Sequence, residues 1–229
     1  TLQVGQEVGS FYMYKQTGIY QSDDEVPESL YKNGVRAGDV IYEDLDGNGA
    51  INVSDRQIVG TANPDFFGGW NNSFSYKNFD LAVFFTYSYG NEIYASYRIN
   101  TDRLGGGFMN MTKRVANERW TGPGTSNTTP RAIYGTTWNT QNSSRFLEDG
   151  SYIRLRSLNL GYTLPPAVAA KLGMNRLRVY LQGDNLHLWT KYRGYDPEVT
   201  NDFDPQFIGQ DNLILPQLRS FNVGVNIGF

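Results

Sequence analysis

The most regular pattern of apolar and polar positions lies at the C-terminal end of the chain. Apolar residues occupy every second position there, and small or polar residues lie between them: Phe221, Val223, Val225, Ile227 and Phe229 against Ser220, Asn222, Gly224, Asn226 and Gly228. A period of two predicts a strand with one apolar face and one polar face. At an open edge in water such a strand would aggregate, whereas in a closed barrel it is paired on both sides and contacts lipid.

Two further segments with this pattern, 66–76 and 79–89, are joined by the dipeptide Lys77-Asn78. Their apolar residues fall on one side of a two-residue hairpin: Phe66, Trp70, Phe74 and Tyr76 on the first strand, and Phe79, Leu81, Val83, Phe85, Tyr87 and Tyr89 on the second. Each strand has about the ten residues needed to cross a bilayer at a tilt. Aromatic residues toward both ends are typical of interfacial girdles.

Three more strands complete the predicted set. Segments 151–164 and 176–190 are separated by Pro165-Pro166 and a short Ala-rich helical turn, and the apolar phase shifts once in each. In the second of them we expect a bulge at Gly183, after which Leu186 and Leu188 continue the apolar face. A sixth strand, roughly 9–20, is weaker because Phe11 and Met13 compete with their neighbours for the apolar face.

The connections between these strands alternate between short and long. They are short at 77–78 and 165–175, and long at 21–65, 91–150 and 191–216. In bacterial barrels the short turns are periplasmic and the long loops extracellular, so we expect all three long connections outside the cell. Six strands cannot close a barrel, since about eight is the smallest common number, so most of the wall must come from elsewhere.

Composition supports a barrel strand pattern. Aromatic residues make up 14% of the chain and charged residues 19%, as expected where half of each strand faces hydrocarbon and half a polar interior. The apolar residues never form a continuous run long enough for a membrane helix. The absence of cysteine excludes a disulfide scaffold, and a net charge of −3 gives no electrostatic footprint for nucleic acid. Residues 1–10 contain no signal peptide pattern, so we expect the natural N-terminus to lie upstream.

One segment has the spacing of a calcium-binding loop. Its candidate ligands are Asp44, Asp46, Asn48, Asn52 and Asp55, with the carbonyl oxygen of Ala50, and Gly49 occupies the sharp-turn position. Calcium takes six to eight oxygen ligands, and alternate side chains of a tight loop can converge on one ion. The role we expect is structural, and the alternative is a turn rich in Asp, Asn and Gly that binds nothing.

Other polar and aromatic residues invite weaker hypotheses. The only histidine, His187, is expected to pack in the barrel lumen or interface, and Asp23, Asp24 and Glu25 form a small acidic cluster. Trp70 and Trp189 are expected in the wall, whereas Trp120 and Trp138, on a long loop, are candidates for stacking on substrate. Arg154 and Arg156 could face the lumen or lie above the membrane. No catalytic nucleophile or carboxylate pair can be argued, so an enzyme is not expected.

An ordered series of short motifs runs through nearly the whole chain. It comprises Gly38-Asp39-Val40-Ile41-Tyr42, Asp44-Leu45-Asp46-Gly47-Asn48-Gly49, Ile58-Val59-Gly60, Gly68-Gly69-Trp70, Tyr76-Lys77-Asn78-Phe79-Asp80-Leu81, Arg119-Trp120-Thr121, Asp149-Gly150-Ser151-Tyr152-Ile153-Arg154-Leu155-Arg156, Leu160-Gly161-Tyr162-Thr163-Leu164-Pro165 and Gly183-Asp184-Asn185-Leu186. In this order the motifs resemble the SusC/RagA family of TonB-linked outer-membrane transporters of Bacteroidetes.

The resemblance implies an all-β fold, a transmembrane antiparallel β-barrel of the large plugged type with about twenty-two strands. Residues 1–229 would then be its C-terminal portion, the last six or so strands, without the plug domain, the TonB box and the N-terminal strands. It also implies import of oligosaccharides or peptides across the outer membrane, driven through TonB, with a SusD-like surface lipoprotein as partner. The alternative is a secreted, calcium-stapled β-sandwich that binds glycans, whose apolar faces would be buried against each other.

Overall fold

The computed structural model describes residues 4–104, 110–135, 137–199 and 207–229. The chain divides into two compact units, and each is built from three separate stretches of sequence. The first unit comprises Thr1–Asn63, Glu92–Glu148 and Val199–Leu213, and the second comprises Pro64–Asn91, Asp149–Glu198 and Ile214–Phe229. The three long connections expected from the sequence therefore fold mainly into the first unit, and the patterned strands form the second.

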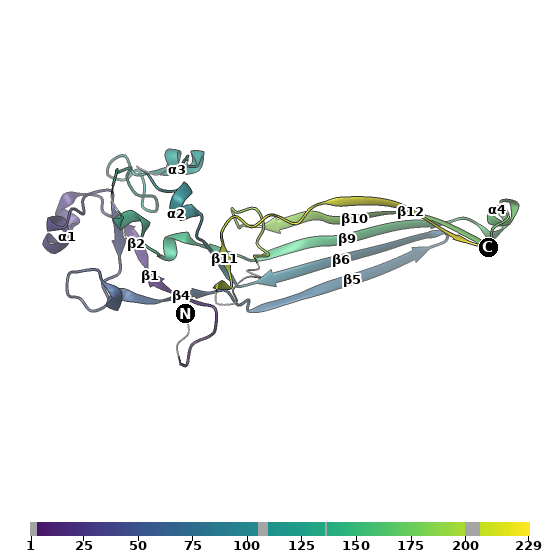
Figure 1. The fold of residues 1–229 in the computed structure, drawn as a ribbon, viewed down its shortest axis with the longest axis horizontal. Helices are drawn as coiled ribbons and strands as arrows, with labels where there is room; N and C mark the ends of the chain where they lie inside the picture. Colours follow the sequence, from purple (N-terminus) through teal and green to yellow (C-terminus); the bar gives the residue numbers. More distant parts are fainter. Residues whose placement is uncertain (1–3, 105–109, 136, 200–206) are drawn as a thin grey trace. The chain divides into compact units, whose positions relative to one another are not determined.

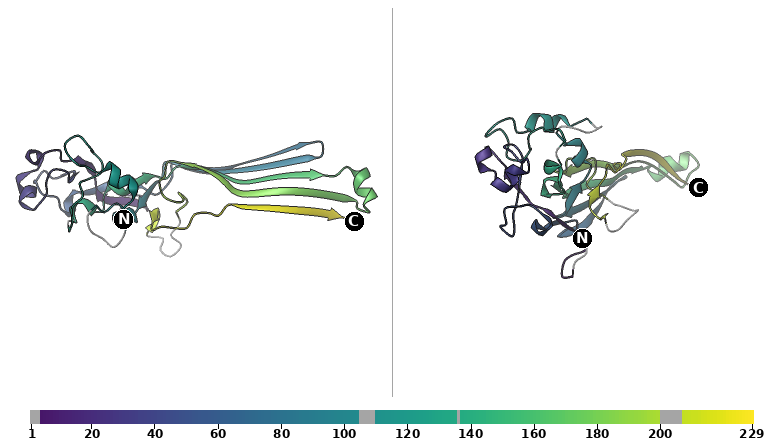
Figure 2. Two further views of the ribbon diagram at one scale, coloured as in Figure 1. Left: turned by 90° about the horizontal axis from the view of Figure 1, so that it is seen from above. Right: turned by 60° about the vertical axis from the view of Figure 1, so that its left-hand side comes forward.

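The second unit is an antiparallel sheet of five strands in the order β12-β10-β9-β6-β5 (Figures 1 and 2). The strands are β5 (Phe66–Tyr76), β6 (Phe79–Tyr89), β9 (Tyr152–Thr163), β10 (Arg176–Thr190) and β12 (Ser220–Gly228). The predicted helical turn is α4 (Pro166–Lys171), which begins at a proline because the first turn needs no backbone N–H donor there. Five of the six predicted strands are thus confirmed.

The register of the sheet gathers most of the large apolar residues of the five strands on one side, here called the apolar face. Its large side chains are Phe66, Trp70, Phe74, Tyr76, Phe79, Leu81, Val83, Phe85, Tyr87, Tyr89, Ile153, Leu155, Leu158, Leu160, Tyr162, Leu177, Val179, Leu181, Trp189, Phe221, Val223, Val225 and Ile227. Many are exposed, and Val223 reaches 77%. An apolar surface this extended is a site for contact with lipid or another protein.

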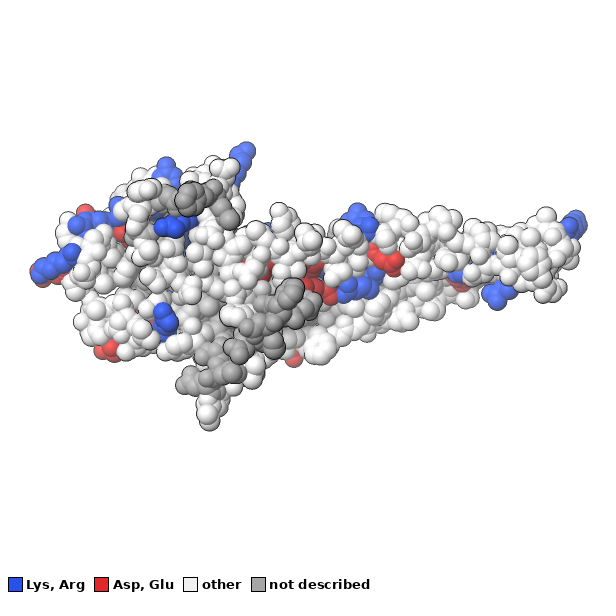
Figure 3. Space-filling model, in the orientation of Figure 1, with Lys and Arg blue, Asp and Glu red and all other residues white. Residues whose placement is uncertain are grey.

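The opposite side, here called the polar face, carries hydrogen-bonded polar groups. Arg178 on β10 reaches across β9 to Asp80 on β6, with Nε 3.0 Å from Oδ1, and also donates to Asn159 at 2.8 Å. The guanidinium and carboxylate meet above Gly161, which leaves them room because it has no side chain. In the view of Figure 3, charged side chains on the strands are sparse and lie in small groups of both signs.

The bulge in β10 lies two residues beyond its predicted position. Gly183 pairs regularly with both neighbouring strands, and the register shift falls between Asp184 and His187. Asn185 has a positive φ of 52°, a conformation that one type of β-bulge uses, and Leu186 covers Gly183. Leu188 pairs with Arg154 on the polar face, so the expectation that it continues the apolar face was wrong.

The predicted strand over 9–20 was also wrong as a strand of this sheet. It consists of two short strands in the first unit, β1 (Ser10–Tyr14), which pairs with β4 (Arg56–Thr61), and β2 (Gln16–Ile19), which pairs with β3 (Val40–Tyr42). Residues on both sides of β1 are buried, which explains why no single apolar face could be assigned from the sequence.

The first unit contains short elements around small aromatic cores. Besides β1 to β4 these are η1 (Asp23–Glu25), α1 (Glu28–Lys32), η2 (Val53–Asp55), β7 (Glu92–Ala95), α2 (Arg98–Thr101), α3 (Lys113–Glu118), η3 (Trp138–Thr140), η4 (Ser144–Phe146), β8 (Leu147–Asp149) and β11 (Gln210–Asp211). One core gathers Tyr14, Ile19, Val40 and Tyr42, with Ile51, Trp120 and Trp138 packed against it. None of the helices formed by the described residues is long and apolar enough to cross a membrane.

Replacement of Gly161 by alanine tests the cross-strand ion pair. A Cβ atom there would overlap the guanidinium of Arg178 and the carboxylate of Asp80. We expect a loss of roughly 0.5–1 kcal/mol in unfolding free energy, which is small because the ion pair is partly exposed and screened by solvent. Denaturant unfolding of the intact protein in detergent measures it. The control is Gly228→Ala, where the nearest atom is 3.6 Å away. Equal midpoints for the two variants would contradict the assignment.

Replacement of Gly38 by alanine tests the packing of the first unit. Gly38 has a φ of +86°, and a Cβ atom would lie 2.5 Å from Cε3 of Trp120 and 2.8 Å from Cβ of Arg131. The control Gly34→Ala has a similar φ of +93° but open space around it, so it carries backbone strain alone. We expect Gly38→Ala to cost about 1–3 kcal/mol more than the control, measured by thermal unfolding. Equal midpoints of thermal unfolding for Gly38→Ala and Gly34→Ala would contradict the proposed packing.

Candidate functional site

The loop predicted to bind calcium folds so that its three aspartates come together. Asp44, Asp46 and Asp55 each present a carboxylate oxygen within 4.8 Å of the others. Asp55, at the end of η2, is fully buried, whereas Asp46 is exposed. No lysine or arginine forms an ion pair with any of these three carboxylates in the part of the chain that the structure describes. The arrangement is therefore a concentration of negative charge that a cation would neutralise.

Backbone N–H groups hold the carboxylates in these positions. Asp44 accepts from the N–H groups of Gly47 and Gly49, both at 2.8 Å, and the two glycines have positive φ angles of 68° and 76°. Asp55 accepts from Leu45 at 2.9 Å and from Asn52 at 2.7 Å. Each carboxylate oxygen has two lone pairs, so these bonds leave acceptor capacity for a cation.

The N–H groups of Gly49 and Gly47 keep the pKa of Asp44 below its ordinary value, because they stabilise the ionised form; desolvation opposes this effect. A carboxyl group with a lowered pKa in the folded state stabilises the loop above its unfolded pKa. That contribution is lost as the pH falls through the folded pKa. Asp44 is therefore ionised, as a calcium ligand must be, at neutral pH.

The other three predicted ligands belong to the same loop and take part in its local bonding. Asn48 accepts the N–H of Ala50 at 2.8 Å, and Asn52 accepts the N–H of Ser54 at 2.9 Å in a capping box with Asp55. Ile51 packs against the aromatic cores of the first unit, as expected for an anchor. The structure thus gathers three of the six candidate ligands as carboxylates, and calcium binding stays a prediction.

The two candidate stacking tryptophans are built into the core of the first unit. Trp120 donates its indole N–H to Gln21 at 3.1 Å, and Trp138 donates to the carbonyl of Val40 at 2.9 Å. Trp138 also packs on Tyr42 with ring centroids 5.4 Å apart. Both rings are half-buried, so contact with substrate stays a prediction and would use only their exposed portions.

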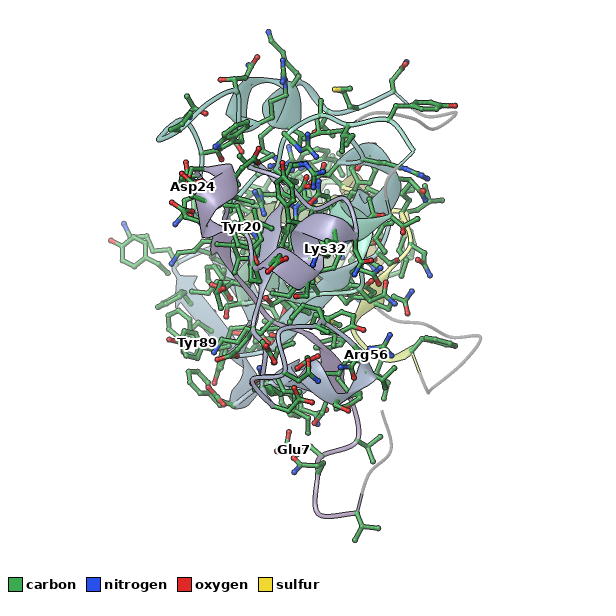
Figure 4. All side chains as sticks on the ribbon, turned by 90° about the vertical axis from the view of Figure 1, so that its left-hand side faces the viewer. Glu7, Tyr20, Asp24, Lys32, Arg56 and Tyr89 are labelled. Atoms are coloured by element: carbon green, nitrogen blue, oxygen red, sulfur yellow. The ribbon has the colours of Figure 1, made fainter. Side chains whose placement is uncertain are left out.

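The acidic cluster around η1 has a local structural role. Asp23 accepts the N–H of Ala37 at 2.7 Å, and Glu25 accepts the N–H of Gln21 at 2.8 Å. Asp24, labelled in Figure 4, is exposed on the same short helix. Two of the three carboxylates therefore fix the loop, and one is available at the surface.

Trp70 and Trp189 lie on the apolar face, as expected for wall residues, and His187 lies on the same face, so the expectation that it could pack in the lumen was wrong. His187 packs edge-on against Trp189, with ring centroids 4.3 Å apart, on the apolar face. Trp70 stacks on Phe85 at 5.7 Å on the same face. The histidine is thus part of a packing cluster near one end of β10.

Several buried ion pairs could not be anticipated from the sequence, because most of their members are far apart along the chain. Arg98 pairs with Asp102 at 2.8 Å and with Glu148 at 2.6 Å, and all three side chains are almost fully buried. Asp39 accepts from Arg131 and from Asn139 at 2.8 and 2.9 Å. These groups tie the separate connections of the first unit together.

Arg154 and Arg156 face the polar side of the sheet and bind carboxylates. Arg154 pairs with Asp196 and, at 2.9 Å, with Glu198. Arg156 pairs with the same Glu198 and donates to Asn185 at 3.2 Å. Both arginines thus contact the segment that follows β10 from the polar face, and a position in the lumen or above the membrane stays a prediction.

Comparison with known proteins places the chain among outer-membrane receptors, although no family model matches it. It is 38% identical over 235 residues to TonB-dependent receptor P3 of Formosa agariphila and 33% identical over 231 residues to TonB-dependent receptor P26 of the same organism. It is 25% identical over 230 residues to TonB-dependent receptor SusC of Bacteroides thetaiotaomicron. These matches cover 99–100% of the chain but only 20–23% of the relatives.

The fold is that of a known transporter. The chain superposes on a structure of the RagAB peptide transporter with a TM-score of 0.73 and 24% identity, over 96% of the chain and 23% of that protein chain. A structure of the RagAB peptide importer in the open-open state gives the same TM-score with 23% identity, over 100% of the chain and 25% of its counterpart. The chain therefore belongs to the SusC/RagA family of TonB-dependent receptors, which are outer-membrane proteins of Gram-negative Bacteroidetes.

Proposed function

We propose that the chain supplies part of the wall and loops of a TonB-dependent channel that imports a large nutrient across the outer membrane. The observation that carries the proposal is the two-sided sheet, whose apolar face is exposed and whose polar face holds hydrogen-bonded charges. In a barrel these faces contact hydrocarbon and a polar interior, respectively. The relatives are receptors and transporters, which supports a transport role over an enzymatic one.

The five-stranded sheet would be part of a closed barrel of about twenty-two strands, as the plugged outer-membrane transporters have. An open sheet with free edges is not tolerated in a bilayer, so β5 requires a further strand beside Phe66–Tyr76 and β12 another beside Ser220–Gly228. With the short turns 77–78 and 165–175 in the periplasm, the long connections would lie outside the cell. A SusD-like surface lipoprotein would cover the extracellular side of the barrel, and TonB would act through a plug domain.

The cargo class we propose is an oligosaccharide or a peptide. SusC and the RagAB peptide importer are among the similar proteins, and the description of the second names peptides as the imported molecules. Uptake separates the two classes: cells with and without the receptor gene are supplied with labelled peptides or oligosaccharides, before and after collapse of the proton gradient. Receptor-dependent, gradient-dependent uptake of either class supports import. Equal uptake by both strains, for every cargo supplied, contradicts it.

The alternative, a secreted β-sandwich that binds glycans, requires a second sheet packed on the apolar face. The described residues leave that face exposed, with Phe221 at 66% and Val225 at 53%. The observations therefore favour the barrel.

A pair of arginine substitutions on β12 tests which face contacts lipid. Val223 lies on the apolar face and its neighbour Asn222 on the polar face. Arginine in contact with the bilayer core costs about 2–4 kcal/mol, and less near the interfaces. We expect Val223→Arg to reduce the amount of folded receptor in the outer membrane, whereas Asn222→Arg leaves it nearly unchanged. Heat-modifiable migration on gels reports the folded fraction. A larger loss of folded receptor in Asn222→Arg than in Val223→Arg would contradict the assignment of faces.

We further propose that Asp44, Asp46, Asn48, Ala50, Asn52 and Asp55 bind one structural Ca²⁺ ion. The gathered carboxylates, without a basic partner among the described residues, support this proposal. The ion would supply charge neutralisation and rigidity, with Asp55 as the buried ligand and Asp46 as the exposed one.

Chelation tests the calcium site in the intact receptor. At a calcium concentration of 100 times Kd, local opening of the loop falls by about a factor of 100, so proteolysis of the loop slows accordingly. EDTA should restore cleavage. Asp46→Asn should raise the calcium concentration needed for protection, since it removes a charge but keeps the acceptor for Asn48. Asp24→Asn, an exposed carboxylate outside the cluster, is the control. Cleavage that is indifferent to EDTA would show that the loop binds no calcium.

A further inference from the structure

The segment that follows β10, residues Lys191–Glu198, is attached to the polar face of the sheet; we call it the strap. Arg154 pairs with Thr86 on β6 and with Leu188 on β10 in the register of the sheet, which places it on the polar face. The carboxylates of Asp196 and Glu198 bind it from the strap. Thr190 fixes the beginning of the strap by accepting the N–H of Tyr192 at 3.1 Å.

A bulge gives the strap a second cationic anchor. Between Leu155 and Ser157 the chain of β9 contains one residue, Arg156, that has no partner on β6 or β10. Arg156 reaches Glu198 on one side and Asn185, in the bulge of β10, on the other. Tyr152 adds a hydroxyl donor to Glu198 at 2.8 Å. The strap is therefore held by three side chains of a single strand.

Asp196 also joins the two ends of the third long connection. One of its oxygens accepts the N–H of Glu198 at 3.0 Å, and the other accepts the N–H of Gln217, also at 3.0 Å. Gln217 lies just before β12, so the strap and the approach to the last strand are fastened to each other. The connection is thus closed at its base, independently of the residues between.

The side chains of the ionic cluster are largely shielded from solvent. The exposed fractions of the side chains are 4% for Arg154, 5% for Asp196, 18% for Glu198 and 28% for Arg156. Burial of charges costs several kcal/mol per ion, and an apolar contact of similar size is often equally stable. A buried cluster therefore contributes little net stability, but removal of one partner leaves an uncompensated charge. The cluster determines where the strap lies more than how stable the sheet is.

We propose that Arg154, Arg156, Asp196 and Glu198 are positioning residues that hold the strap inside the barrel, where it narrows the path of the cargo. This inference rests on the proposed function, because only in a closed barrel is the polar face the interior. The four residues lie at the end of the sheet from which the long connections leave, opposite α4 and the chain end (Figure 1). Tyr195, next to the anchored Asp196, is 67% exposed, and in the proposed arrangement its side chain would face the passage.

Cysteine labelling in living cells tests the position of the strap. The chain has no cysteine, so Tyr195→Cys in a receptor otherwise free of cysteine gives a single probe. A small membrane-impermeant maleimide should label this thiol. A maleimide on a bulky polyethylene glycol chain should react at about one tenth of that rate or slower. The exposed Asp24→Cys serves as the reference for both reagents. Equal relative rates of both reagents at the two positions would overturn the proposal.

Release of the strap provides the second arm. In Asp196→Asn/Glu198→Gln, the bulky reagent should label the thiol at position 195 at least about tenfold faster, because each 1.4 kcal/mol of lost attachment multiplies the released fraction by about ten. Asp184→Asn, a carboxylate on the same face that binds Gln182 and Ser220, should change nothing. If the double variant does not assemble, Arg156→Gln, the most exposed member, provides the milder release. Unchanged labelling in an assembled release variant would overturn the proposal.

The labelling result does not depend on transport. If the strap behaves as expected while uptake shows no cargo, the position of the strap stands and the import function fails. If uptake is receptor-dependent while the thiol at position 195 is openly accessible, the import function stands and the strap lies elsewhere. If the position of the strap and the import function are both supported, the release variants should import cargo larger than the cargo that the parent receptor imports.

Discussion

The structure of the second unit depends on one constraint, that each strand presents alternate side chains to two different environments. Backbone groups are bonded between strands, so the environment of each face is set by side chains alone. The apolar face is continuous across five strands because the register keeps apolar residues opposite one another, from Phe66 beside Tyr89 to Leu177 beside Ile227. On the other face, small residues such as Gly161 leave room for charged side chains to cross a strand and find partners.

The first unit obeys a different rule, because its strands are short and β1 is buried on both sides. Its stability comes from aromatic packing such as that around Tyr42 and Trp138, and buried ion pairs such as Arg98 with Glu148 fix how distant parts of the chain lie against one another. The loop with Asp44, Asp46 and Asp55 is attached to this core through Ile51. A cation in that loop would therefore act directly on the folded connections of the first unit.

The sequence was sufficient for features that depend on local spacing. The strands 66–76 and 79–89 have the boundaries that alternation indicated, and the three aspartates of the loop predicted to bind calcium converge as their positions predicted. Alternation failed for residues 9–20, since burial on both sides of β1 removes the contrast between faces. The bulge was displaced from Gly183 because Asn185 also tolerates a positive φ and Leu186 needs the space above the glycine. The strap was not predicted, because Arg154 and Asp196 are 42 residues apart and no local pattern links them.

The central claim, that one face of the sheet contacts lipid and the other a polar interior, can be measured residue by residue. Spin labels placed one at a time at positions 220 to 228 of the receptor in bilayers report contact with oxygen, which partitions into lipid, and with a water-soluble nickel complex. The account predicts a period of two, with oxygen contact highest at Phe221, Val223, Val225 and Ile227 and lowest at Asn222, Gly224 and Asn226. Accessibility without alternation, or with oxygen contact highest at the even positions, would contradict it.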